Sequence, residues 1–210
     1  MRELRPGVWH WTASHPEWVS SEPWGPDVSS YAIDEGERLL LFDPLAVPEE
    51  LLGGERDVVI VLTAPWHERD AESLVERLGT KVFTAPRDSA QQLMEQFGLT
   101  AEQAGDGSPD ILWLTDADKT DRPDGIEVFP GHKHNDRVYW LEGHHVVVVG
   151  DTLVDFGEGL HINERWLTKN MTRDQIIEGL RPLLDQPVDL VLPAHGAPAD
   201  RAALERALRT

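Results

Sequence analysis

The chain has 210 residues, of which 40% are hydrophobic, with a formal net charge of −19 and no cysteine. The charge excludes a general nucleic-acid binder, because so acidic a surface repels phosphate backbones, and the lack of cysteine excludes disulfides, thiolate metal ligands and cysteine nucleophiles. Without an apolar run near the ~20 residues that span a bilayer, or an apolar signal stretch at the N-terminus, the sequence predicts a cytoplasmic protein with no membrane contact.

The first segments read as β-structure. Gly7–Thr12 alternates apolar and polar residues and predicts a strand, and the segment His15–Asp27, rich in Pro, Ser and Trp, predicts a long loop. Tyr31–Asp34 and Arg38–Asp43 flank a Glu-Gly pair, which is typical of a β-hairpin.

The next stretch gathers titratable side chains at a strand-to-helix junction. Val58–Leu62 is an unbroken apolar, β-branched run and predicts a strand buried on both faces, which ends near Pro65 because proline lacks an N–H. His67–Asp70 then lead into a predicted helix, Ala71–Leu78, closed by Gly79. Such junctions often carry sites in layered α/β proteins. The alternative is an ordinary loop whose acidic first helical turn suits the helix dipole.

The remainder of the chain mixes short strands with helices. Because the order is not a strict βαβα series, two packed sheets with outer helices fit better than a doubly wound sheet, and we expect a single domain over residues 1–210. No Gly-rich loop follows a strand, which argues against a nucleotide fold. The predicted strands are Lys81–Ala85, Ile111–Leu114, Gly125–Phe129, Arg137–Leu141, His145–Val149 and Val188–Leu192; the predicted helices are Asp88–Gln96, one capped by Thr172, and Ala199–Leu208.

Four polar clusters share one context, since each comes directly after an apolar strand. Imidazole and carboxylate suit Zn²⁺, Mn²⁺ or Fe, although a single His after a strand is more often a hydrogen-bonded loop residue. Glycine beside three of the clusters lets the backbone turn sharply and aim a side chain inward. The clusters are His67-Glu68 with Asp70, His132 with His134, Asp151, and His195.

The order of these landmarks resembles the metallo-β-lactamase superfamily over nearly the whole chain. The matching segments are a buried strand with a threonine at its end, Pro-Gly-His132, Gly-Asp151-Thr-Leu and Pro-Ala-His195-Gly. The resemblance implies an α+β fold, a four-layer αβ/βα sandwich, with a metal site between the sheet edges and hydrolysis by metal-activated water. It also implies that Asp151 is the bridging ligand and that His132 and His195 are the late His ligands of the two metal positions.

The family's main signature, Thr-His-x-His-x-Asp-His, is missing from this chain. The sequence therefore argues against a normal dinuclear centre. His67 is one residue out of register, and a shift of one residue in the loop would bring it into the site. The positions after Thr63 hold Ala64 and Trp66 in place of the leading His residues, Glu68 in place of Asp, and Arg69 in place of the last His.

Two functions remain open from the sequence. The first is a hydrolase with a mononuclear centre, in which Zn²⁺, or Mn²⁺ or Fe, activates water against an ester, thioester, lactone or phosphodiester. Asp151 and His195 would hold the metal, with one or both of His132 and Glu68 or His67. Asp151, His67 and Asp70 are its candidate catalytic residues, with Asp70 or His134 as a proton relay.

The alternative is a metal-free, degenerate protein of this type whose cleft binds a ligand or does no chemistry. Arg69 then places a permanent positive charge in the missing His position, where we expect it to pair with Asp151 or Glu68. The substrate, the metal and the oligomeric state stay open. The acidic surface, with lysine only at positions 81, 119, 133 and 169, favours a high-salt source as a hypothesis.

Overall fold

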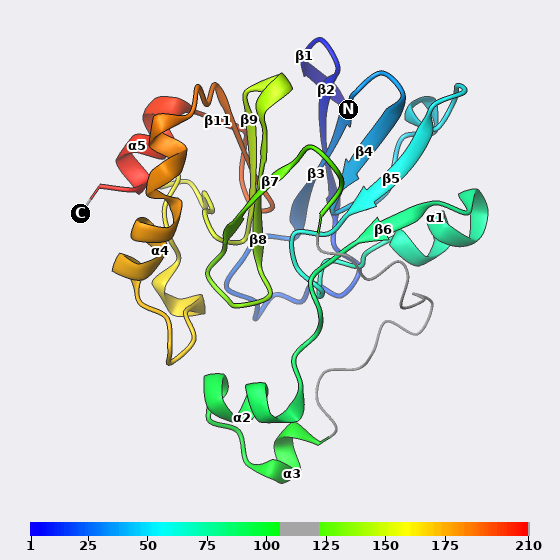
Figure 1. Ribbon diagram of the computed structural model, residues 1–210. Helices are drawn as coiled ribbons and strands as arrows, with labels where there is room; N and C mark the ends of the chain where they lie inside the picture. Colours follow the sequence, from blue (N-terminus) through cyan, green and yellow to red (C-terminus); the bar gives the residue numbers. More distant parts are fainter. Residues whose placement is uncertain (106–121, 210) are drawn as a thin grey trace.

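The computed structural model describes residues 1–105 and 122–209, and two β-sheets pack face to face in it (Figure 1). The first sheet has the strand order β1-β2-β3-β4-β5-β6. Strands β1 to β4 are antiparallel neighbours, whereas β4, β5 and β6 run parallel. The strands are β1 (Arg2–Arg5), β2 (Val8–Ser14), β3 (Asp27–Asp34), β4 (Arg38–Phe42), β5 (Asp57–Val61) and β6 (Lys81–Phe83).

The second sheet has the strand order β11-β10-β9-β8-β7. Strands β7, β8 and β9 are antiparallel neighbours, β9 and β10 run parallel, and β11 pairs antiparallel with β10. The strands are β7 (Glu127–Pro130), β8 (Arg137–Leu141), β9 (Val146–Gly150), β10 (Leu190–Pro193) and β11 (Ala199–Asp200).

Helices cover the outer faces of both sheets (Figure 1). α1 (Ala71–Leu78) lies on the six-stranded sheet, and α4 (Arg173–Leu180) and α5 (Arg201–Ala207) lie on the five-stranded sheet. α2 (Ala90–Phe97) and α3 (Ala101–Ala104) project from the lower end of the sandwich in the view of Figure 1. Among the described helices, none has the length and apolar character needed to cross a membrane. Short 3₁₀ turns occupy Glu49–Leu51, Glu142–His144, Glu164–Trp166 and Arg181–Asp185.

Strand β4 shows why both faces of the first sheet are buried. Leu40 and Phe42 enter the layer between the sheets, where they pack with apolar residues of β8 and β9. Leu39 and Leu41 alternate to the other face and pack with apolar residues of β5 and α1. A third cluster joins the second sheet to α4 and α5. The layers therefore follow as helix, sheet, sheet and helix, and the predicted αβ/βα sandwich is confirmed.

Several predicted elements are present with shifted ends. The hairpin is formed by β3 and β4, and Thr172 caps α4 by accepting a hydrogen bond from the Gln175 N–H, as predicted. The predicted helix Ala199–Leu208 starts too early, because Ala199–Asp200 pairs with β10 as β11 before α5 begins. β1 was not among the predicted strands, and the predicted strand Ile111–Leu114 lies outside the described residues.

The carboxyl ends of strands from both sheets approach each other closely at Gly150, the last residue of β9. Gly150 has φ +51°, and a Cβ at this position would lie 2.6 Å from Thr63 Oγ1, which follows β5. Only glycine combines this backbone conformation with so close an approach. The absence of a side chain at Gly150 thus allows the loops after β5 and β9 to meet at one edge of the sandwich.

Candidate functional site

Four of the residues singled out in the sequence lie at this edge. His67 follows β5, His132 follows β7, Asp151 follows β9 and His195 follows β10. His67 Nε2 lies 3.2 Å from Asp151 Oδ2, and His195 Nε2 lies 3.5 Å from Asp151 Oδ1. The centroid of the Trp166 ring lies 6.5 Å from that of His132 and 5.5 Å from that of His195.

His67 lies between two buried carboxylates. Its Nδ1 is 3.0 Å from Asp43 Oδ2, on the side opposite the contact of Nε2 with Asp151. Thr63 fixes Asp43, because its N–H donates to Oδ1 at 2.7 Å and its hydroxyl donates to Oδ2 at 2.6 Å. The indole N–H of Trp66 donates to Asp151 Oδ2 at 3.2 Å. An imidazole with a carboxylate at each ring nitrogen is held as the cation, which donates from both.

The electrostatics of this cluster favour the charged form of every member. Burial alone would lower the pKa of His67, but the charges of Asp151 and Asp43 outweigh burial and raise this pKa to about 10. For Asp151, burial would raise the pKa, but the positive charge of His67 and its hydrogen bond hold the pKa well below its usual range. The pKa of Asp43 is lowered in the same way, against its burial, by His67 and Arg69. The cluster is therefore a set of buried charges that neutralise one another.

Arg69 is a second, partly buried cation at this edge, but it does not occupy the position expected from the sequence. Its Nη1 donates to the backbone oxygens of Ser29 and Asp43 at 2.8 and 2.6 Å. Within residues 1–105 and 122–209 it forms no ion pair with a carboxylate. The expected pairing of Arg69 with Asp151 is wrong, because His67 takes that place.

Glu68 and Asp70 also differ from the expectation. Glu68 forms an ion pair with Arg87, so it is not paired with Arg69. Asp70 Oδ2 accepts a hydrogen bond from the Ala46 N–H at 2.6 Å and so fixes the loop after β4. Both line a smaller cavity beside the cleft rather than the one that Asp151 lines. The structure thus brings neither the proposed carboxylate ligand nor the proposed proton relay to Asp151.

His132 is fixed from behind by a buried carboxylate. Its Nδ1 lies 2.5 Å from Asp136 Oδ2, and its backbone N–H donates to Thr152 Oγ1 at 3.1 Å. Because Nδ1 donates to the carboxylate, Nε2 is the ring nitrogen that faces away from Asp136. That Nε2 is buried and has no hydrogen-bond partner among the described residues. His134 instead lies 3.0 Å from Asp88.

His195 is enclosed by aromatic rings. The centroids of Trp24, Trp166 and Phe156 lie 5.1, 5.5 and 5.8 Å from its own. Burial lowers the pKa of His195 to about 4, although the charge of Asp151 acts in the opposite direction. His195 is therefore neutral near pH 7, in contrast to His67.

The donor set does not fit the metal centre that the sequence resemblance implies. Within the described ranges, no three His, Cys, Asp or Glu side chains are arranged to hold a metal ion together, whereas a zinc site needs three or four protein ligands. Asp151 Oδ2 already accepts from His67 and Trp66. Asp151 Oδ1, His132 Nε2 and His195 Nδ1 lack hydrogen-bond partners among the described residues, but these three atoms are not arranged to bind one ion together.

A cavity of about 510 Å³ lies beside Asp151, and three tryptophans line it: Trp24, Trp66 and Trp166. Its volume falls in the range of small-molecule sites, roughly 300–1,000 Å³. Trp66 is 36% exposed, and Phe97 of α2, which also lines the cavity, is 41% exposed. Large aromatic side chains that stay exposed around a cavity indicate a surface that contacts another molecule.

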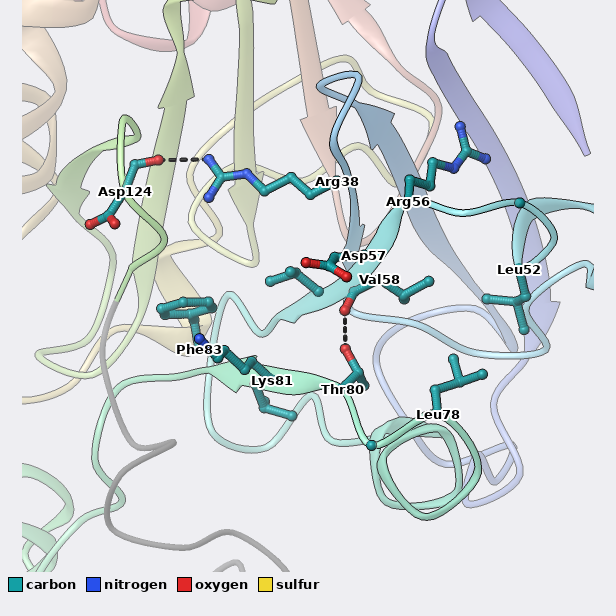
Figure 2. A pocket seen from close by; sticks show the side chains of 14 residues that line it. Arg38, Leu52, Arg56, Asp57, Val58, Leu78, Thr80, Lys81, Phe83 and Asp124 are labelled. Atoms are coloured by element: carbon teal, nitrogen blue, oxygen red, sulfur yellow. Dashed lines mark hydrogen bonds between the residues drawn. The ribbon is translucent and has the colours of Figure 1, made fainter.

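A larger cavity, of about 900 Å³, lies at the opposite edge of the first sheet, where β4, β5 and β6 begin (Figure 2). Arg38 in its wall pairs with Glu35 and donates to the Asp124 backbone oxygen, and Arg56 pairs with Asp34. No histidine is among its described lining residues. Because its arginines already have partners, this cavity offers less chemistry than the one beside Asp151.

Three residues of the site were not identified from the sequence. Asp43 and Asp136 hold the two imidazoles, and Trp66 binds Asp151 although it stands where the resemblance places a His. Asp43 could have been found, since it directly follows the apolar end of β4 as the other clusters follow their strands. For Asp136, no signal separates it from an ordinary loop carboxylate.

Comparison with known proteins supports the fold. No protein-family model and no curated protein matches the chain. Among solved structures, an archaeal metallo-β-lactamase superfamily protein from Sulfolobus tokodaii aligns with TM-score 0.62 and 16% identity, over 96% of this chain and 84% of that one. A metallo-β-lactamase family protein from Thermus thermophilus aligns with TM-score 0.61 and 17% identity, over 98% and 78%.

A third similar structure, that of VMB-1, aligns with TM-score 0.59 and 15% identity over 99% of this chain and 93% of that chain. The chain therefore has the metallo-β-lactamase fold. Identities of this size show the fold alone.

Proposed function

We propose that this protein binds a small organic molecule in the tryptophan-lined cavity without a metal ion, and that His67 supplies the positive charge that Asp151 needs. The observation that carries the proposal is the position of the His67 ring, 3.0 Å from Asp43 and 3.2 Å from Asp151. A buried carboxylate needs a neighbouring positive charge or donors, and here the chain itself provides both.

Charge balance supports the proposal. The two buried carboxylates of Asp43 and Asp151 are matched by two cations, the buried His67 and the partly buried Arg69. A divalent ion would add two positive charges to a set that is already neutral. It would also require His67 to lose a proton that the two carboxylates hold strongly.

A second candidate is the hydrolase with a single metal ion, and one feature favours it. Asp136 holds Nδ1 of His132 while Nε2 has no partner among the described residues, which is the arrangement typical of a metal-bound His. Asp151 Oδ1 also lacks a partner, with His195 Nε2 3.5 Å away. This candidate requires the contact between His67 and Asp151 to open, and its substrates would be esters, thioesters, lactones or phosphodiesters.

Metal analysis of untagged protein purified without chelator, followed by calorimetric titration with zinc, tests the proposal. We expect well under one metal ion per chain and no zinc binding in the micromolar range. Stoichiometric metal, or micromolar zinc binding that Asp151→Asn abolishes and Glu68→Gln retains, would overturn it in favour of the hydrolase. Glu68→Gln is the matched control, because Glu68 pairs with Arg87 outside the cleft.

A further inference from the structure

We infer that the ligand of the tryptophan-lined cavity is an aromatic carboxylate, whose ring lies among the tryptophans and whose anionic group lies at Lys133 and Arg165. This inference rests on the proposed function and specifies its ligand. It follows from three features of the described residues: the charges that line the cavity, its aromatic walls, and the burial of the free oxygen of Asp151.

The charges that line the cavity have the opposite balance from the rest of the chain. His67 balances Asp151, and Arg69, which also lines the cavity, balances Asp43. The remaining charged residues of the lining are Lys133 and Arg165, which are positive, and Glu17, which is negative. Neither Lys133 nor Arg165 forms an ion pair with any described residue. In a protein with a net charge of −19, two unpaired cations at one aromatic cavity favour an anionic ligand.

The aromatic walls of the cavity favour a ligand with a flat, apolar ring. Trp24, Trp66 and Trp166 present large aromatic surfaces to a cavity of about 510 Å³. Stacked or edge-to-face contacts with such rings favour an aromatic ligand beyond the burial of its area. Phe97 of α2 adds a further exposed ring to the cavity, so a ligand with one or two fused rings would bury aromatic surface that is otherwise in water.

A cationic ligand fits less well. The ammonium group of Lys133 already lies 4.2 Å from the centroid of the Trp66 ring, so one face of Trp66 is occupied by a cation, and the charges of Lys133 and Arg165 would repel a cationic ligand. The free oxygen of Asp151, Oδ1, is buried and not available at the surface of the cavity. A multiply charged phosphate would meet stronger repulsion from the acidic chain as a whole than a singly charged carboxylate would, which favours the carboxylate.

Calorimetric titration with three probes of the same shape tests the inference: naphthoate, naphthamide and naphthylmethylammonium, at low KCl and with a metal chelator present. We expect naphthoate to bind about tenfold more tightly than naphthamide, since two partly exposed charge contacts add up to about this factor. The ammonium probe should bind most weakly. The advantage of naphthoate should shrink in molar KCl, because salt screens exposed charges.

Substitutions locate the anionic group. Lys133→Met and Arg165→Met keep an unbranched, flexible side chain but remove the charge, and the double variant should bind naphthoate no more tightly than naphthamide. Lys81→Met is the matched control, since Lys81 lines the cavity at the opposite edge of the sheet. Naphthamide affinity should not change in any variant, which would show that the cavity is intact.

The outcomes separate this inference from the proposed function. Equal binding of naphthoate and naphthamide, tighter binding of the ammonium probe, or no binding of naphthoate would overturn the carboxylate inference and leave metal independence standing. Naphthoate binding that appears only after the chelator is replaced by zinc would overturn metal independence itself. Retention of the naphthoate preference in the double variant would also contradict the inference, because residues other than Lys133 and Arg165 would then bind the carboxylate.

Discussion

His67 and Asp151 join the two sheets of the sandwich, with Nε2 and Oδ2 3.2 Å apart. His67 follows β5 of the first sheet and Asp151 follows β9 of the second. On the other side of the ring, Asp43 follows β4. Three strand ends therefore meet through one imidazole, which gives His67 a structural role that can be measured as stability.

Replacing His67 with glutamine should destabilise the fold. The substitution leaves Asp43 and Asp151 buried without their shared cation, and breaking a buried pair by removing one partner costs about 3–5 kcal/mol. Urea unfolding of the variant and of the unchanged protein measures the difference. Glu68→Gln, next in the chain but paired outside the cleft with Arg87, should stay within about 0.5 kcal/mol. A loss below about 1 kcal/mol for His67→Gln would contradict the charged cluster.

The His67 contribution should disappear at alkaline pH. The folded-state pKa of His67 is about 10, whereas an unfolded chain has about 6.5. Because the folded state holds the proton more strongly, the stabilisation is complete below about pH 6.5 and falls as pH rises through about 10. The difference in unfolding free energy between the unchanged protein and His67→Gln should therefore narrow over that range. A difference that is constant with pH would show that His67 is neutral.

Gly150→Ala should be strongly destabilising. A Cβ at Gly150 would lie 2.6 Å from Thr63 Oγ1, and the residue has φ +51°. Thr63 cannot move freely, because it donates two hydrogen bonds to Asp43. We expect a loss of at least about 2 kcal/mol from strain and displacement together. Gly53→Ala, where a Cβ meets nothing within 4 Å, is the control in thermal unfolding, and equal losses at both positions would refute the close approach.

The acidic surface should make stability depend on salt and prevent nucleic-acid binding. With a net charge of −19, repulsion between surface carboxylates weakens as salt screens it, so the unfolding midpoint should rise from low to molar KCl. In the same buffers, an unrelated oligonucleotide should not be retained in a mobility-shift assay. A midpoint that is flat with KCl would argue against the high-salt hypothesis, and tight, salt-sensitive DNA binding would overturn the partner prediction.

Much of the fold could be predicted because its elements carry local signals. The apolar run Val58–Leu62 gave β5, and the glycine after Leu78 marked the end of α1. β1 was not predicted because Arg2–Arg5 is mostly polar and partly exposed, so its sequence carries no strand pattern. It forms a strand only through its pairing with β2. The start of α5 was shifted for a similar reason, since Ala199–Asp200 pairs with β10.

The site could be predicted only in part. That His67, Asp151, His132 and His195 lie at one edge follows from their shared position after strands, and the structure brings them together. Which groups pair could not be read from the sequence, because pairing depends on side-chain direction in irregular loops. Arg69 has φ +46° and donates to backbone oxygens. Asp151 therefore pairs with His67 and not with Arg69.

Nitrogen-15 NMR of the histidine side chains at about pH 8, with equimolar zinc present, tests the central claim most directly. The His67 signal is assigned from its absence in His67→Gln. The account predicts that both ring nitrogens of His67 carry protons, since each faces a carboxylate, and that zinc leaves the histidine signals unchanged. A deprotonated His67 nitrogen, or zinc-dependent shifts at His132 and His195, would contradict it and show that a metal ion, not an imidazolium, binds Asp151.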